Sequence, residues 1–388
     1  LQKHSLGNFR ELLHAITTNP AMLVYLGGNM NTKLAPNENY AREVMELFAL
    51  GKTLEVRYTE DDVKAVARTL TGWKDDKVKI SAHFNAEDHD TSDKKLSAFF
   101  NNKKIAGKLH ADGANEAEEV INIIFSKMEA ARFLCRNLYR WFLYPHIDDK
   151  IEEKIVMPLS EICIKSDFNV IPVLRTLLSS QHFFDKAFIG CMVKNPIDFL
   201  IGATLQVDTL AYDEQNKSCN LQQSKEAWFW LQFYCEELTM RIGDPPSVAG
   251  WPAYYQAPNY YRWWVNSSLL STRNYLLEQM STGKGLLKNG RYVRFNFIGF
   301  VNSLVNAENT TLLIEECLNL LCAIRPPESV VIQLRDILET KKSETHGWGK
   351  TWKQLQQVPN DLNTIRDVES RLSFFFTLIF KLPEFQVM

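Results

Sequence analysis

The stretch PNENYAREVMELFALGKTLEVRYTEDDVKAVARTLTGW, residues 36–73, decides the fold because it encodes two consecutive helices with apolar faces. The first, residues 37–50, has an asparagine at its start and stops at Gly51, a residue type that readily takes the left-handed conformation of a helix end. The second, residues 59–72, opens on a threonine that can accept hydrogen bonds from amides of the first turn. The short connection predicts that the two helices are neighbours in an all-α fold.

The polar side chains of the first helix gather on one narrow arc. With about 3.6 residues per turn, this arc consists of Asn39, Arg42, Glu43 and Glu46. The other positions are almost all apolar, so the arc faces either a thin strip of solvent or a network that lines a cleft. Arg42, together with Arg68 of the second helix, is predicted to neutralise the two carboxylates. Such a group forms either scaffolding or a functional site, and both interpretations stay open.

These residues resemble a known family. NENYAREVMELFALG followed by YTEDDVKAVARTLTGW closely resembles the signature of the bacterial family called domain of unknown function 1800. Three later stretches resemble the same family in the same order: HDTSDKK at 89–95, GDPPSVAGWPAYYQAPNYYRWWVNSSLL at 243–270, and the terminal LPEFQVM at 382–388. The resemblance implies an all-helical architecture and a set of motif positions. It implies no substrate and no catalytic role.

The composition of the 388 residues is that of a soluble globular protein. With 45% hydrophobic and 23% charged residues, the chain can bury a sizeable core. A formal net charge of -2 argues against nucleic acid as a partner, and short basic runs such as Lys94-Lys95 are predicted to lie on solvated faces. No segment reaches the roughly 20 apolar residues of a membrane helix, so no membrane span is predicted.

Two features bear on the cellular compartment. The chain begins without a methionine or an export-signal pattern, so we expect that an upstream part has been removed. Its seven cysteines are scattered in apolar contexts, which favours reduced core thiols over disulfides. Neither feature decides between the cytoplasm and export.

The whole pattern predicts an all-α, multi-helical globular bundle. Before the signature, residues 8–26 form two short helices that are broken at Asn19-Pro20. After Trp73 the apolar residues alternate and then give way to polar ones, which predicts a small hairpin or extended excursion near residues 77–112.

Helical periodicity resumes after Asn115 and continues to the end of the chain. The expected helices are residues 117–127, 130–144, 151–166, 171–180, 196–210, 222–241, 260–280, 295–306, 311–323, 329–341 and 362–380. Residues 283–290 and 343–349 are the expected flexible loops. Any division is expected near residue 285, between a main helical domain, residues 1–285, and a C-terminal helical subdomain packed on it, residues 286–388; a single domain is the alternative.

The loop EDHDTSD, residues 87–93, is a second polar focus with little hydrophobic support. Oxygen-rich loops bind hard cations, but the glycine and the distal glutamate of a calcium loop are missing here. We therefore predict no cofactor and keep a divalent cation at Asp88–Asp93 as an alternative. His89 and Asp90 are expected within hydrogen-bonding reach of the signature helices, where they would approach the carboxylates of the polar arc.

Aromatic residues concentrate in WPAYYQAPNYYRWW, residues 251–264. Aromatic platforms bind sugar rings and bases by stacking. Buried aromatics are nevertheless common, and Trp263-Trp264 begins a predicted helix, so at least one of this pair is expected in the core. Arg273, further along that helix, is expected to pair with an acid.

Two functions of different classes fit these features. In the first, a cleft binds or hydrolyses a small or carbohydrate-like ligand, with two acids in general acid and base roles. Its catalytic residues would be Glu43, Glu46, His89 and Asp90, and its ligand-binding residues Asn39, Arg42, Arg68, Trp251, Tyr255 and Trp263. In the second, the protein is a non-catalytic interaction protein, in which the polar signature locks helices together and the aromatic loop meets a protein or carbohydrate partner.

Overall fold

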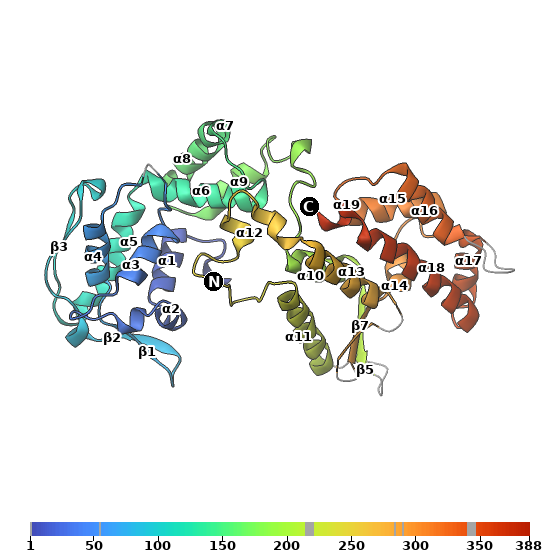
Figure 1. The fold of residues 1–388 in the computed structure, drawn as a ribbon, viewed down its shortest axis with the longest axis horizontal. Helices are drawn as coiled ribbons and strands as arrows, with labels where there is room; N and C mark the ends of the chain where they lie inside the picture. The colour runs from blue at the N-terminus through green and yellow to red at the C-terminus, as the bar shows by residue number, and fades with distance from the viewer. Residues whose placement is uncertain (1, 54–55, 214–220, 283–284, 289–290, 340–346) are drawn as a thin grey trace. The chain divides into compact units, whose positions relative to one another are not determined.

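The computed structural model describes residues 2–53, 56–213, 221–282, 285–288, 291–339 and 347–388. Helices dominate this part of the chain, and the strands are few and short, so the predicted all-α class is confirmed (Figure 1). The chain forms two compact units, Leu1–Asp185 and Lys186–Met388, called unit 1 and unit 2 below. Residue 285, where the sequence places a division, lies inside unit 2.

Unit 1 is mainly helical. Its helices are α1 (Phe9–Thr17), α2 (Pro20–Tyr25), α3 (Glu38–Glu46), α4 (Glu60–Thr69), α5 (Glu116–Phe125), α6 (Met128–Phe142), α7 (Asp149–Ile151), α8 (Met157–Lys165) and α9 (Val170–Leu178). The break between α1 and α2 falls at the predicted place, because the Asn19 side chain caps α2 and Pro20 occupies its first position. The single helix predicted over residues 151–166 includes a π-helical turn, Glu152–Val156, before α8.

The two signature helices are neighbours, as predicted. The Asn37 side chain accepts a hydrogen bond from the Tyr40 amide at the start of α3. At the start of α4, Thr59 and Asp62 each accept a hydrogen bond from the other's backbone amide, which is a capping box. Both helices end several residues before their predicted glycines, and turns fill the difference.

The predicted excursion consists of two small antiparallel hairpins. One pairs β1 (Trp73–Asp76) with β2 (Ser81–Phe84), and the other pairs β3 (Lys94–Lys95) with β4 (Lys104–Ile105). The first hairpin begins before residue 77 because Trp73 lies opposite Phe84, with ring centroids 5.6 Å apart. Aromatic cross-strand pairs of this kind stabilise a short sheet.

Unit 2 combines helices with one small sheet. Its helices are α10 (Pro196–Gln206), α11 (Leu221–Glu237), α12 (Pro252–Tyr255), α13 (Ser267–Ser281), α14 (Phe297–Asn302), α15 (Thr310–Leu321), α16 (Glu328–Glu339), α17 (Trp348–Gln357), α18 (Leu362–Lys381) and α19 (Pro383–Gln386). Its antiparallel sheet has the strand order β5-β7-β6, in which the strands are β5 (Thr209–Asp213), β6 (Leu286–Lys288) and β7 (Arg291–Phe295).

Several local predictions for unit 2 are wrong. The helix expected to reach residue 210 ends at Gln206 and β5 follows, while β6 lies within the expected loop 283–290. These strands have three to five residues, too short for their period to show in the sequence. The helix α17 was not predicted, although Trp348, Trp352 and Leu355 recur at helical spacing and are buried. Residues 343–346 lie outside the described residues.

The core of unit 2 is built around α18. This helix contacts α13, α14, α16, α17 and α19 (Figure 1). Phe376 of α18 is fully buried, and its ring stacks on Phe297 of α14 at a centroid distance of 4.4 Å. Among the described helices, none is both long enough and apolar enough to cross a bilayer.

A fully buried arginine joins the terminal motif to α13 inside unit 2. Arg273 of α13 donates to Gln386 Oε1 at 3.0 Å and to the carbonyl of Lys194, and its guanidinium lies 4.4 Å from the centre of the Phe199 ring. Gln386 belongs to the terminal motif LPEFQVM. The expected acid partner is therefore replaced by neutral acceptors, and burial lowers the pKa of Arg273 to about 10.

We predict that Arg273→Met lowers the free energy of unfolding by about 2 kcal/mol, because two buried acceptors lose their donor. Removal of a buried charge offsets part of that cost. Denaturant unfolding checks the prediction, with Arg335→Met on the exposed face of α16 as the control. The double variant Arg273→Met, Gln386→Leu should recover part of the loss, and an unchanged midpoint for Arg273→Met would contradict the assignment.

Candidate functional site

The arginines of the signature do not pair with the carboxylates that the sequence suggested. Arg42 forms two hydrogen bonds with Glu60, at 2.9 and 2.6 Å, and Arg68 bonds Asp90 at 2.7 Å. The predicted pairing of both arginines with Glu43 or Glu46 is therefore wrong. The reason is the geometry of α4: Glu60 lies in its first turn beside α3, whereas Arg68 lies two turns further on.

Glu43 and Glu46 form a separate carboxylate pair on α3. Glu46 bonds Lys52 at 3.1 Å, and Glu43 is half-buried. Burial, and then the charge of Glu46, raises the pKa of Glu43. Burial and the same charge also raise the pKa of nearby Tyr58 to about 12. Asn39, at the start of the arc, is exposed.

His89 is buried between the end of α4 and the start of α5. Its Nδ1 lies 2.9 Å from the carbonyl oxygen of Thr71, which can only accept, so Nδ1 carries the proton. Its Nε2 lies 3.2 Å from Glu116 Oε1. Since Asp90 bonds Arg68 of α4 and His89 bonds Thr71, the expected contact of the loop with the signature is confirmed.

The fit around His89 is close. A Cβ atom on Gly113 would lie 2.6 Å from His89 Cδ2, so only glycine fits at that position.

A fully buried ion pair completes this network. Lys94 Nζ donates to Glu116 at 2.5 Å and to the carbonyl of Asp90, and the other Glu116 oxygen accepts from the Lys108 amide at 2.7 Å. Burial alone raises the pKa of Glu116, but the bonds from His89, Lys94 and the Lys108 amide outweigh it and lower that pKa. We call His89, Lys94 and Glu116 the buried triad.

Two members of the buried triad, Lys94 and Glu116, carry no sign of their burial in the sequence. Lys94 was predicted on a solvated face, and this is wrong because the pairing of β3 with β4 turns Lys94 inward and Lys95 outward. Glu116 has the sequence appearance of an ordinary acidic first-turn residue, like Glu118 and Glu119 beside it. No local signal distinguishes it.

The predicted catalytic residues thus fall into two groups. His89 and Asp90 contact α4, the start of α5 and the loop beside them, whereas Glu43 and Glu46 interact with each other and with Lys52. In the first group every charge meets an opposite charge or several hydrogen bonds. That arrangement locks the loop against the two helices.

The acids of the loop also face cations of the chain itself. Asp88 lies 3.2 Å from Lys74, and Asp93 pairs with Lys104. In the described ranges there is no group of three or more His, Cys, Asp or Glu residues that could hold a metal ion. The divalent cation remains a prediction, for which elemental analysis of the purified protein is the test.

The aromatic stretch builds a pocket in unit 2. Three tryptophans contribute to the lining of a cavity of about 420 Å³, with Pro246, Pro252 and Ala253 beside them: Trp251, Trp263 and Trp264. Trp264 is buried while Trp263 is 45% exposed, so the expectation that at least one of this pair lies in the core is confirmed. Both belong to a 3-10 turn, Tyr260–Trp264, ahead of α13. Tyr255, the third ligand-binding candidate of this stretch, is exposed at the end of α12. We call this cavity the aromatic pocket.

Tyr254 holds the tryptophans of the aromatic pocket in place. Its ring meets those of Trp251 and Trp264 nearly edge to face, with centroids 6.4 and 5.7 Å apart. Its hydroxyl lies 3.2 Å from the side-chain amide of Asn195, which also caps α10. Burial raises the pKa of Tyr254 to about 12. The aromatic stretch is thereby anchored to a regular helix.

The opposite edge of the aromatic pocket is polar. It is formed by the end of α11 and the residues after it, namely Glu236, Thr239, Arg241 and Asp244. The Arg241 guanidinium lies 3.6 Å from Glu236 and 3.3 Å from Asp244, longer than the roughly 2.7–2.9 Å of a strong charged hydrogen bond. Because these ion pairs are long, their donor and acceptor atoms can also form hydrogen bonds with a ligand. No local pattern marks them in the sequence, because they are ordinary surface residues until the fold brings them to the tryptophans.

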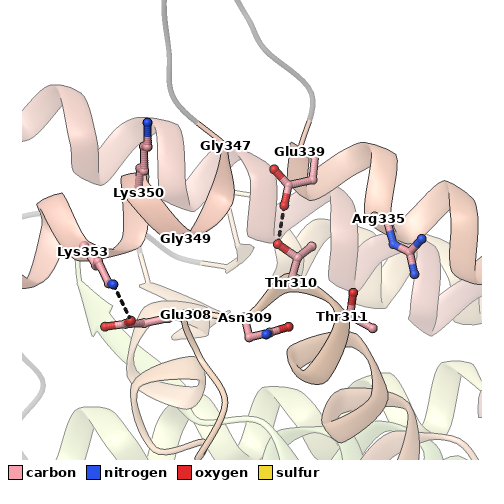
Figure 2. A pocket seen from close by; sticks show the side chains of 10 residues that line it. All are labelled: Glu308, Asn309, Thr310, Thr311, Arg335, Glu339, Gly347, Gly349, Lys350 and Lys353. Carbon is pink, nitrogen blue, oxygen red and sulfur yellow. Dashed lines mark hydrogen bonds and ion pairs between the residues drawn. The ribbon is translucent and has the colours of Figure 1, made fainter.

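A second cavity lies between the starts of α15 and α17 and the end of α16, with a volume of about 620 Å³ (Figure 2). Its carboxylates are already engaged. Glu308 pairs with Lys353 at 3.2 Å, and Glu339 accepts from the Thr310 hydroxyl and the Trp348 amide. The aromatic pocket is therefore the better candidate for a ligand site.

A family model described as "Protein of unknown function (DUF1800)" matches residues 1–387 of the chain. The chain belongs to this family. The family description names no activity, so membership assigns no role to any residue of this DUF1800 chain. No curated protein and no solved structure matches the chain in the corresponding comparisons.

We predict that Lys94→Met destabilises this DUF1800 protein by about 3–5 kcal/mol, because it leaves a buried carboxylate without its cation. Lys95→Met, one position along the same strand but exposed, is the matched control. Chemical denaturation measures both variants. The double variant Lys94→Met, Glu116→Leu should be more stable than Lys94→Met alone. Equal effects of the two lysine variants would contradict the buried pair.

The stability of the protein should also fall in acid through Asp90. Burial raises the pKa of Asp90, but hydrogen bonds from Arg68 and Ser92 outweigh it and lower that pKa to about 2. The stabilisation is thus complete above the unfolded pKa and is lost as the pH falls from about 4 towards 2. Wild type should lose up to about 1 kcal/mol more than Asp90→Asn between pH 5 and pH 3, after solvent screening is allowed for. Denaturation midpoints at pH 5 and pH 3 check this, and parallel losses would refute it.

Proposed function

We propose that this DUF1800 protein is a non-catalytic binding protein whose aromatic pocket holds a neutral carbohydrate ring. The observation that carries the proposal is the set of three tryptophans that share one cavity of about 420 Å³, with Trp263 45% exposed. Ligand pockets commonly have volumes of about 300–1,000 Å³. An indole ring that stays partly in water at such a cavity offers a flat face for stacking.

The polar edge of the aromatic pocket suits hydroxyl groups. Carboxylates accept hydrogen bonds and a guanidinium donates them, so Arg241 beside Asp244 can bond neighbouring hydroxyls of a sugar. Two carboxylates and one guanidinium give this edge a net negative charge. That charge disfavours an acidic sugar and leaves a neutral one as the preferred ligand.

The geometry of unit 1 supports the non-catalytic part of the proposal. A general acid or base must reach the proton that it transfers. His89 and Glu116 are buried, Glu116 is bonded to Lys94, and His89 Nε2 lies 3.2 Å from Glu116, so both residues act as scaffolding in this interpretation.

Hydrolysis at the carboxylate pair of α3 is the second candidate function. In glycosidases the general acid has a raised pKa and a second carboxylate stays ionised. The raised pKa of Glu43 would suit the first role, and the charge of Glu46 the second. Release of reducing ends from an oligosaccharide, lost in both Glu43→Gln and Glu46→Gln, would favour this candidate over simple binding.

Binding is tested directly with a panel of defined ligands. Isothermal titration and tryptophan fluorescence would be measured with neutral hexose and N-acetylhexosamine tetrasaccharides. A tetrasaccharide of uronic acid and tetramethylammonium would test anionic and cationic ligands. The proposal expects binding of a neutral tetrasaccharide with a change in fluorescence. Binding of tetramethylammonium alone would instead identify the aromatic pocket as a site for cations.

Trp263→Ala should weaken binding of the neutral tetrasaccharide about 5- to 30-fold, because a stacking face worth about 1–2 kcal/mol is removed. Since Trp263 is partly exposed, the fold should survive, and the melting temperature verifies this. Trp141→Ala is the matched control, because Trp141 is 49% exposed on α6 of unit 1 and is not one of the lining residues. Equal affinities of the two variants would exclude the aromatic pocket as the binding site.

A further inference from the structure

Thr239 has an unusual backbone conformation at the edge of the aromatic pocket. It follows α11 with a φ of 75°, in the left-handed region. Its amide donates to the carbonyl of Glu236 at 2.7 Å, and the next amide, of Met240, donates to that of Cys235 at 2.8 Å. These two bonds define the Schellman motif that ends a helix, and its left-handed position is usually glycine.

A β-branched residue in this conformation is strained, because its side chain crowds the backbone. Among the described residues with positive φ, Thr239 and Ile80 are the two that are β-branched. The nearby left-handed positions Gly243 and Gly250 carry glycine, although a Cβ there would have open space around it. Thr239 therefore differs from the nearby left-handed positions, which carry glycine.

The side chain of Thr239 has no stabilising role that offsets this strain. It is exposed, and its hydroxyl makes no hydrogen bond to the described residues. It does contribute to the lining of the aromatic pocket, whereas Gly243 and Gly250 do not. Backbone strain that the packing does not require is often kept for a functional reason.

We infer that Thr239 is a specificity-determining residue of the aromatic pocket, whose hydroxyl bonds a hydroxyl of a neutral sugar stacked on the tryptophans. This inference rests on the proposed function of the pocket. A hydroxyl both donates and accepts, so it complements sugar hydroxyls in either orientation. Together with Arg241 and Asp244 it gives the polar edge three separate contacts for one ring.

Three variants of the full chain separate the hydroxyl from the backbone strain. Thr239→Val keeps the shape and the strain but removes the hydroxyl, Thr239→Gly removes both, and Thr239→Ser keeps the hydroxyl without the β-branch. The probe is the neutral tetrasaccharide that wild type binds most tightly. Affinity is measured by isothermal titration and stability by thermal melting.

The expected pattern has two independent parts. The valine and glycine variants should bind about 3- to 10-fold more weakly, as expected for one lost hydrogen bond, and the serine variant should bind like wild type. The glycine variant should melt about 2–4 °C higher because the strain is relieved, whereas the valine variant should melt like wild type.

Each result that contradicts the expected pattern would overturn a different part of the inference. Wild-type affinity in Thr239→Val would overturn the role of the hydroxyl and leave the proposed function of the aromatic pocket intact. An unchanged or lower melting temperature of Thr239→Gly would overturn the strain argument. If wild type binds no saccharide of the panel, the proposed function fails and the ligand role of Thr239 fails with it.

Discussion

Glu116 is a carboxylate removed from water, and the segment from His89 to Lys108 is arranged around the cost of that burial. An unpaired buried charge is prohibitively unfavourable, so each oxygen of this side chain must find donors inside the protein. Lys94 and the Lys108 amide supply donors, and His89 Nε2 lies 3.2 Å from one of the oxygens. Because these donors come from the excursion after α4, the carboxylate fixes the excursion against α5. The positions of His89 and Lys94 are therefore accounted for by the burial of Glu116.

Unit 2 also buries a charged side chain, in this case the cation of Arg273. Arg273 is as buried as Glu116, but it is held by a carbonyl oxygen, the Gln386 side chain and an aromatic ring instead of an acid. The terminal motif is thereby bound to α13, the helix that follows the aromatic stretch. In both units a motif that looks functional in the sequence includes residues that hold distant segments together.

The aromatic pocket differs from both of these networks because its polar side chains are exposed and its ion pairs are long. Arg241 stands between two carboxylates at distances longer than strong hydrogen bonds, and the hydroxyl of Thr239 has no partner among the described residues. Trp263 keeps nearly half of its surface in water. Polar groups and aromatic faces without close partners are common in binding sites, because the ligand supplies the missing contacts.

The sequence by itself determined the helical class, the neighbouring signature helices, the cap residues and the contact of His89 and Asp90 with the signature. These features depend on local periodicity or on segments close in the chain, where the order of residues limits the geometry. Only the tertiary structure decided that Arg42 meets Glu60, that Lys94 turns inward to Glu116, and that the end of α11 faces the tryptophans. Those outcomes depend on strand register and on packing between segments far apart in the chain. A lysine or glutamate carries no local sign of whether its fold will bury it.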